Sequence, residues 1–98
     1  MIQIISAGEL EARLDEEDVR VLDVREDDEF VLGHIRGAMN LPLSGFPEIM
    51  SRLDWHLKYY VIDASGDRSD RACKYLDEAG HHVTKVDGGM DAWEGEVK

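Results

Sequence analysis

The segment Asp63-Ala64-Ser65-Gly66-Asp67-Arg68-Ser69 has the composition of an anion-binding turn between a strand and a helix. Backbone N–H groups in such a turn, together with the partial positive charge of a helix N-terminus, can hold an anion or a thiolate. Gly66 permits a positive φ, Arg68 can supply a fixed cation, and Ser69 can act as the N-cap. An ordinary connection between a strand and a helix has the same residue types, so the segment alone leaves both interpretations open.

The elements around this segment form an alternating series. β-branched and aromatic runs predict strands, and capping and glycine signals predict helices. The chain contains no Asn-Gly or Asp-Gly turn joining two strands, so we expect one α/β domain over residues 1–98 with a mainly parallel sheet. Strands are expected at 2–5, 19–24, 38–41, 58–63 and 82–86, and helices after Ser6, at 26–32, 44–53 and 69–79, and after Gly88-Gly89.

The charge balance excludes several kinds of partner. The 98 residues carry 11 Lys plus Arg against 22 Asp plus Glu, a net charge of -11, which repels nucleic acid and anionic membranes. No apolar run approaches the roughly 20 residues of a membrane span. The first residues lack the pattern of a signal peptide, so we expect a cytoplasmic protein. One cysteine excludes an internal disulfide, and four scattered histidines predict neither a metal site nor a bound cofactor.

Three segments, taken in order, resemble the rhodanese family of sulfurtransferases. Residues 63–69 resemble the family's active-site loop, Cys-x-x-Gly-x-Arg-Ser, with aspartate in place of the cysteine. Residues 22–43 resemble its first signature, although Arg36 stands where proline is usual, and residues 86–93 resemble its C-terminal signature. The resemblance implies a three-layer fold, with about five mainly parallel strands flanked by helices. It also implies that the loop cysteine takes sulfur from thiosulfate or a persulfide and passes it to a nucleophile.

Carried over by position, Asp63 stands at the catalytic nucleophile, and Arg68 is the cation that contacts the anion. The anion-binding loop would consist of Ala64, Ser65, Gly66, Asp67, Arg68 and Ser69. A carboxylate is a hard nucleophile and forms no persulfide, so the chain should not transfer sulfur. Asp63 can instead act as a built-in anion that weakens binding of small sulfur anions, with Asp67 and Asp70 adding charge of the same sign.

Three interpretations of Asp63 remain open. The chain is a natural pseudo-enzyme kept for binding or regulation, or a sulfurtransferase whose nucleophile has been replaced, whether naturally or by engineering. Alternatively, Asp63 is itself a nucleophile that forms an acyl phosphate, which is the weakest interpretation because no Mg²⁺-binding pattern accompanies it. The sequence names no sulfur donor, acceptor or protein partner.

Other candidate residues have a structural interpretation that we prefer. Cys73 shares an apolar helical stripe with Ala72, Leu76 and Ala79, which predicts core packing rather than catalysis. We expect Asp23 and Arg25 to form an ion pair that supports the loop. His34 is expected to pack between segments, His81 and His82 to lie on the surface, and Trp55 to be exposed enough to contact a partner.

Overall fold

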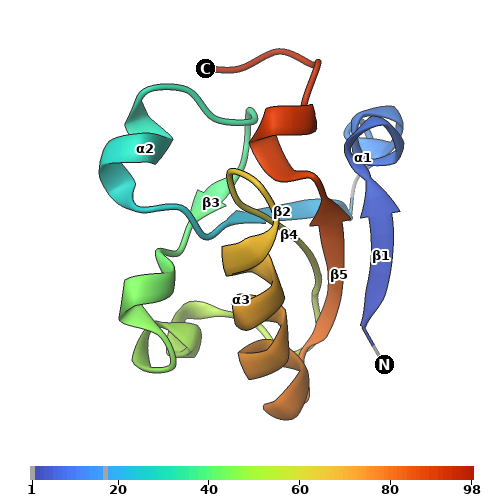
Figure 1. The fold of residues 1–98 in the computed structure, drawn as a ribbon. Coiled ribbons are helices and arrows are strands. Elements are labelled where there is room, and N and C mark those ends of the chain that lie inside the picture. The colour runs from blue at the N-terminus through green and yellow to red at the C-terminus, as the bar shows by residue number, and fades with distance from the viewer. Residues whose placement is uncertain (1, 17) are drawn as a thin grey trace.

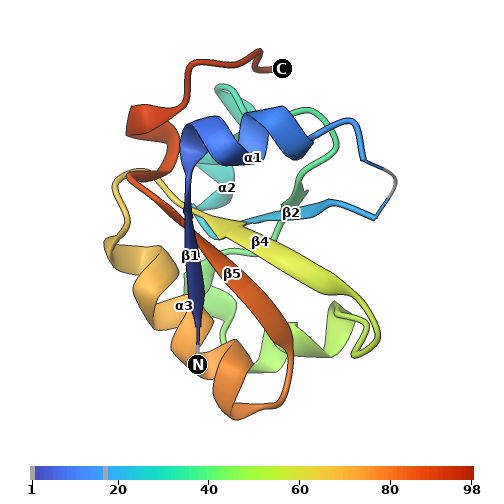
Figure 2. The same ribbon diagram turned by 90° about the vertical axis from the view of Figure 1, so that its right-hand side faces the viewer.

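A computed structural model of the chain describes residues 2–16 and 18–98. Its centre is a sheet of five parallel strands in the order β1-β5-β4-β2-β3. The sheet twists strongly, so that its strands fan out when viewed from the side (Figure 2). The strands are β1 (Gln3–Ser6), β2 (Arg20–Asp23), β3 (Met39–Asn40), β4 (Lys58–Ile62) and β5 (His82–Asp87). The prediction of a five-stranded parallel α/β fold is confirmed.

The helices connect the strands as expected for a parallel sheet (Figure 1). Helix α1 begins with the predicted capping box, in which the Ser6 hydroxyl accepts the Glu9 N–H and the Glu9 carboxylate accepts the Ser6 N–H. No helix among the described residues is long and apolar enough to cross a membrane. The helices are α1 (Ala7–Arg13), α2 (Asp27–Val31) and α3 (Asp67–Glu78), with short 3-10 helices at Leu43–Gly45, Glu48–Arg52 and Gly89–Ala92.

Two apolar clusters, one on each face of the sheet, make the fold three layers thick. Side chains of α3 pack on one face and side chains of α1 on the other. Strand β4 lies in the middle of the sheet and contributes alternate residues to both clusters. Tyr59 and Val61 face α3, while Tyr60 and Ile62 face α1. Burial on both faces explains why this strand is a continuous apolar run.

Two predicted helix boundaries are wrong. The α-helix predicted at 44–53 is replaced by two 3-10 helices at 43–45 and 48–52, because Phe46 between them is extended (φ -77°, ψ 148°), as the steric demand of Pro47 favours. Helix α3 begins at Asp67 and not at Ser69. Gly66, at φ 116°, takes the N-cap position that we had assigned to Ser69, so Ser69 lies inside the first turn.

His81 is the residue whose predicted exposure is wrong. Its side chain is 4% exposed and stacks on the indole of Trp55, with ring centroids 4.0 Å apart. The Nδ1 atom of His81 is buried and has no hydrogen-bond partner among the described residues. Trp55 is 56% exposed, as expected, and one face of its indole covers the histidine. Burial, with a smaller contribution from His82, lowers the pKa of His81.

This burial predicts that His81 makes folding stability fall in mild acid. Because the pKa of His81 is lower in the folded chain than its ordinary 6.5, the unfolded chain binds the proton more readily. The contribution is complete above pH 6.5 and is lost as the pH falls toward the folded pKa. Urea unfolding at pH 7.5 and 5.5 should show a smaller pH dependence for His81→Phe, which keeps the ring stack, than for the parent. Equal pH dependence would show that His81 contributes nothing.

Candidate active site

The loop between β4 and α3 lies at the carboxyl end of the central strand. Ligands of open α/β sheets bind at this edge. Asp63 follows β4 directly, and its side chain is fully buried beneath the loop. Ala64 and Ser65 form the more accessible part of the loop, and Gly66 is buried where the chain turns into α3.

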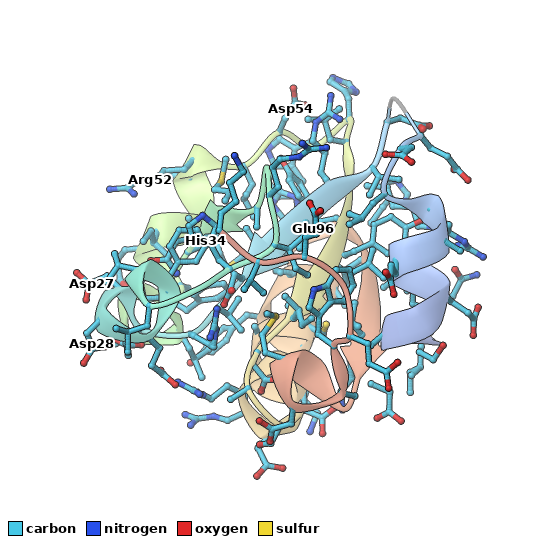
Figure 3. The ribbon with its side chains drawn as sticks, turned by 90° about the horizontal axis from the view of Figure 1, so that it is seen from above. Asp27, Asp28, His34, Arg52, Asp54 and Glu96 are labelled. Atoms are coloured by element: carbon cyan, nitrogen blue, oxygen red, sulfur yellow. The ribbon has the colours of Figure 1, made fainter. Side chains whose placement is uncertain are left out.

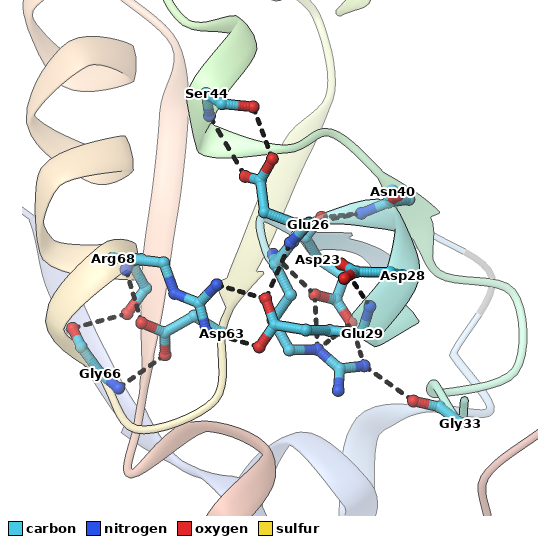
Figure 4. Close-up of polar contacts among 12 residues, drawn as sticks. Asp23, Glu26, Asp28, Glu29, Gly33, Asn40, Ser44, Asp63, Gly66 and Arg68 are labelled. Atoms are coloured by element: carbon cyan, nitrogen blue, oxygen red, sulfur yellow. Dashed lines mark hydrogen bonds and ion pairs between the residues drawn. The ribbon is translucent and has the colours of Figure 1, made fainter. Parts of the chain in front are cut away.

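Both carboxylate oxygens of Asp63 accept backbone hydrogen bonds from the loop (Figure 4). The Gly66 N–H donates to Oδ1 at 2.6 Å, and the Ser69 N–H donates to Oδ2 at 2.9 Å. The Ser69 N–H is one of the first-turn donors that have no partner inside a helix. The Asp63 carboxylate therefore caps α3 from the preceding strand, while the Ser69 hydroxyl donates to the Gly66 carbonyl.

The segment after β5 holds the other side of the loop. The Met90 N–H donates to the Asp63 carbonyl at 2.7 Å, and the Asp91 N–H donates to the Ala64 carbonyl at 2.8 Å. A Cβ atom at Gly89 would lie 2.5 Å from the Asp63 carbonyl oxygen, and φ is +59° there. Only glycine fits this approach without displacement of the backbone. In the sequence, Gly88-Gly89 indicates only the start of a helix, and no local signal shows the contact of Gly89 with the loop.

Arg68 binds Glu29 of α2 rather than Asp63 (Figure 4). Its Nη1 and Nη2 atoms donate to the two Glu29 oxygens at 2.5 and 2.9 Å, in a bidentate pair. Hydrogen bonding from Arg68 lowers the pKa of Glu29 to about 2. A cavity of about 270 Å³ lies beside this pair, lined by Arg68 and Arg71 of α3 with Glu26, Leu43 and Ser44. Asp63 does not line this cavity.

The pair predicts that the titration of Glu29 depends on Arg68. In Arg68→Gln, the pKa of Glu29 should rise from about 2 toward its ordinary 4.5. In the parent, the stabilisation of the fold by the Glu29–Arg68 pair is present above pH 4.5 and is lost as the pH falls toward 2. Because both side chains are about one-third exposed, its size should stay below about 1 kcal/mol. Carboxyl-carbon NMR titration measures the pKa directly, and an unchanged Glu29 pKa in the variant would contradict the assignment.

The expected ion pair between Asp23 and Arg25 is present and buried. Arg25 Nη2 and Nε donate to the two carboxylate oxygens at 2.8 and 3.1 Å, and Nη2 also donates to the Gly33 carbonyl. The Asn40 side chain donates to the carbonyls of Asp23 and Arg25. These contacts fix the connection from β2 to α2 and so position Glu29. Whether the pair also supports the loop through the Glu29–Arg68 contact stays a prediction.

Lys85 on β5 is a charged residue near the site that sequence analysis missed. Its side chain is nearly buried, and Nζ donates to the Asp70 carboxylate at 2.7 Å. A Cβ atom at Gly66 would lie 3.6 Å from the Lys85 Nζ atom, so the ammonium group lies against the loop. The hydrogen bond to Asp70, with a smaller effect of Asp63, raises the pKa of Lys85. The available signal was a lysine between Thr84 and Val86, inside the strand predicted at 82–86.

The other two candidates, Cys73 and His34, lie in positions that indicate a structural role. Cys73 is 1% exposed on the inner face of α3, and burial raises its pKa to about 12. His34 stacks on Phe30, and its Nδ1 atom is 2.9 Å from the Phe30 carbonyl. Both residues are placed as predicted. Within residues 2–16 and 18–98, no three His, Cys, Asp or Glu side chains are grouped so that they could hold a metal ion.

Comparison with known proteins agrees with this architecture. The family model of the rhodanese-like domain matches residues 6–96. YtwF of Bacillus subtilis is 43% identical over 99% of this chain and 95% of its own length. The thiosulfate sulfurtransferase GlpE of Shewanella oneidensis is 31% identical over 91% of this chain and 89% of its own.

Solved structures show the same fold. A rhodanese-like domain protein from Staphylococcus aureus has a TM-score of 0.91 at 32% identity, covering 99% of this chain and 97% of its own. A rhodanese-related protein from Thermoplasma volcanium has a TM-score of 0.90 at 35% identity, covering 98% of this chain and 97% of its own. The match therefore extends over nearly the whole chain in both sequence and structure, and the chain belongs to the rhodanese-like family.

Proposed function

We propose that this chain is a rhodanese-like module that binds or regulates a protein partner and does not transfer sulfur. In this proposal Asp63 occupies the position of the family's catalytic cysteine, residues 1–98 form one domain, and the protein acts in the cytoplasm. The single observation that carries the proposal is the buried Asp63 carboxylate, whose two oxygens accept the loop N–H groups that would otherwise be available to an anion.

The chemistry of sulfur transfer explains why Asp63 matters. A thiolate attacks the sulfane sulfur of thiosulfate, sulfite leaves, and a cysteine persulfide remains. Cyanide then takes that sulfur as thiocyanate, and the thiolate is regenerated. A carboxylate oxygen cannot take the place of the sulfur atom, because the intermediate must be a persulfide.

Cys73 offers no replacement. Its sulfur lies in the core beneath α3, and a thiol with a pKa of about 12 is almost entirely protonated at neutral pH. The surroundings of the loop also disfavour small sulfur anions. Asp63 accepts hydrogen bonds from the two loop amides, Glu29 pairs with Arg68, and Asp70 pairs with Lys85, so each of these donors already has an acidic partner.

The test measures sulfur transfer and the sulfur adduct separately. The parent protein is incubated with thiosulfate and cyanide, and thiocyanate is measured; a second sample without cyanide is analysed by intact mass spectrometry. We expect no thiocyanate above the rate without protein and no added sulfur. Cys73→Ala is the matched control, and native Cys73 should not react with a thiol reagent until urea is added. Thiocyanate formation that Cys73→Ala abolishes would contradict the proposal.

A sulfurtransferase whose nucleophile has been replaced is the second candidate. The observation that favours it is the order of the surrounding loop, in which Gly66 and Ser69 direct their N–H groups at the side chain of residue 63. Restoring a thiol at position 63 tests whether the nucleophile is the one group that this loop lacks for sulfur transfer.

A further inference from the structure

Three large aliphatic side chains lie exposed on one surface of this strongly acidic protein. Val31 is 71% exposed, Leu32 is 89% exposed and Val97 is 54% exposed. Val31 and Leu32 are adjacent in sequence, and Val97 lies against the next residue, since a Cβ atom at Gly33 would be 3.7 Å from a Val97 methyl group. We call Val31, Leu32 and Val97 the aliphatic patch. Contiguous exposed apolar side chains mark interaction sites more often than isolated ones do.

The backbone beneath the aliphatic patch is held in place. The His34 N–H donates to the Lys98 carbonyl at 3.1 Å, and the Lys98 N–H donates to the His34 carbonyl at 2.7 Å. Stacking of His34 on Phe30 ties the same segment to α2. An ordered apolar surface loses little conformational entropy when a partner covers it.

The aliphatic patch belongs to the same edge of the sheet as the loop after β4. Helix α2 follows β2, and the last residues follow β5, so both segments leave the carboxyl ends of parallel strands (Figure 1). Glu29, on the same short helix as Val31, holds Arg68 of the loop. A partner on the patch would therefore sit beside the closed anion site.

Acidic side chains border the aliphatic patch. Asp27 and Asp28 lie on α2 before Val31, and Glu94 and Glu96 precede Val97; all four are exposed. Viewed from above, Asp27 and Asp28 project outward at one side, and Glu96 lies toward the middle of the same view (Figure 3). None of the four forms a salt bridge within the described residues. An apolar centre with a charged border is the usual form of a protein interface.

We propose that the aliphatic patch and its acidic border dock a positively charged amphipathic segment of another protein. The aliphatic side chains would cover the apolar face of that segment, and the four carboxylates would pair with its lysines or arginines. A second copy of this chain fits poorly, since each copy carries a net charge of -11. The proposal rests on the proposed role as a binding module, for which it names the surface and the partner's chemistry.

The first experiment uses a synthetic amphipathic peptide of leucine and lysine, about 14 residues long so that it can form a helix. Fluorescence anisotropy measures its binding to the full chain, and amide NMR shifts locate it. We expect shifts concentrated at residues 27–34 and 94–98. A peptide with glutamate in place of lysine is the control and should not bind. Failure of the leucine–lysine peptide to bind, or shifts spread over the whole surface, would overturn the proposal.

Matched variants separate docking from general charge attraction. Leu32→Ser should weaken binding at least about tenfold, since it removes most of the apolar side-chain area that the partner would bury at this position. Ile4→Ser removes an aliphatic side chain on β1, the edge strand farthest from β2 and β3, where Ile4 is 62% exposed. This control should change affinity less than about twofold. Equal losses in the two variants would overturn the proposal.

A second comparison of variants tests the contribution of the acidic border to binding. Asp27→Asn with Asp28→Asn should weaken binding at low salt more than Asp77→Asn with Glu78→Gln, which removes two exposed acids at the end of α3. The difference should vanish at high salt, where surface charges are screened. Equal losses from the two pairs would overturn the docking site, as would self-association that Leu32→Ser abolishes. Sulfur-transfer assays on the same samples test the proposed function independently, because neither the aliphatic patch nor its border contacts Asp63.

Discussion

Replacing Asp63 with cysteine should give this chain thiosulfate:cyanide sulfurtransferase activity, which we expect the parent protein to lack. The side chain at position 63 is surrounded by groups that would stabilise a thiolate. The N–H groups of Gly66 and Ser69 converge on it, the first turn of α3 adds partial positive charge, and the Lys85 ammonium group lies against the loop. A thiolate in place of the carboxylate would keep the negative charge that these groups already hold.

The new thiol should therefore ionise easily. Helix N-termini and nearby cations lower a cysteine pKa from about 8.5 to about 7 or below. The pH dependence of alkylation in Asp63→Cys/Cys73→Ala reports this pKa, since residue 63 is then the only thiol. Lys85→Met in that background should raise the thiol pKa, whereas Lys74→Met, which removes an exposed lysine of α3, should change it little.

The activity assay compares Asp63→Cys with Asp63→Ser. The serine variant removes the carboxylate without adding a soft nucleophile, so it should remain inactive while the cysteine variant forms thiocyanate. Activity in Asp63→Cys would show that only the nucleophile is missing. Inactivity, despite a reactive thiol and native unfolding behaviour, would show that the acidic surroundings have also closed the site, with Asp67 and Asp70 as the first residues to test. Activity in the parent or in Asp63→Ser would contradict the mechanism itself.

Much of the fold follows from local sequence signals. The strand predicted at 58–63 and the helix predicted after Ser6 each depend on residues close in sequence, and both are confirmed. Residues 44–53 are predicted as one helix because Pro47 is tolerated in a first helical turn, whereas proline also favours an extended conformation at the residue before it, and Phe46 is extended.

The candidate site was less predictable because its contacts are long-range. Glu29 and Arg68 are separated by 39 residues, and no local pattern shows that they pair. Lys85 reaches the loop from a strand that follows it, and Gly89 matters because its backbone lies against the Asp63 carbonyl. His81 seemed to be a surface residue because it stands in a polar turn, whereas Trp55, from a distant loop, covers it. Sequence analysis identified the loop but not the residues that hold it.

Replacing Arg25 with methionine should destabilise the fold by about 3–5 kcal/mol, the usual cost of leaving one member of a buried ion pair without its partner. Asp23 is fully buried, and in the variant it would keep the backbone N–H of residue 25 but lose the guanidinium. The Gly33 carbonyl would lose its donor at the same time. Because small domains are stable by about 5–15 kcal/mol, urea unfolding should detect the loss clearly. Arg52→Met, at an exposed arginine, should cost less than about 0.5 kcal/mol.

The double variant Asp23→Leu/Arg25→Met distinguishes whether the Asp23–Arg25 pair stabilises the fold or positions α2. A buried pair and an apolar replacement of similar volume are often equal in stability, so the double variant should recover much of the loss seen in Arg25→Met. It should not recover the Glu29–Arg68 contact, because the turn from β2 to α2 would lack the bond from Arg25 to Gly33. Loss of this contact, together with loss of the Arg25 charge that also lowers the pKa of Glu29, should raise that pKa above about 2 even where stability returns. A double variant with restored stability and an unchanged Glu29 pKa would show that the pair plays no part in positioning α2.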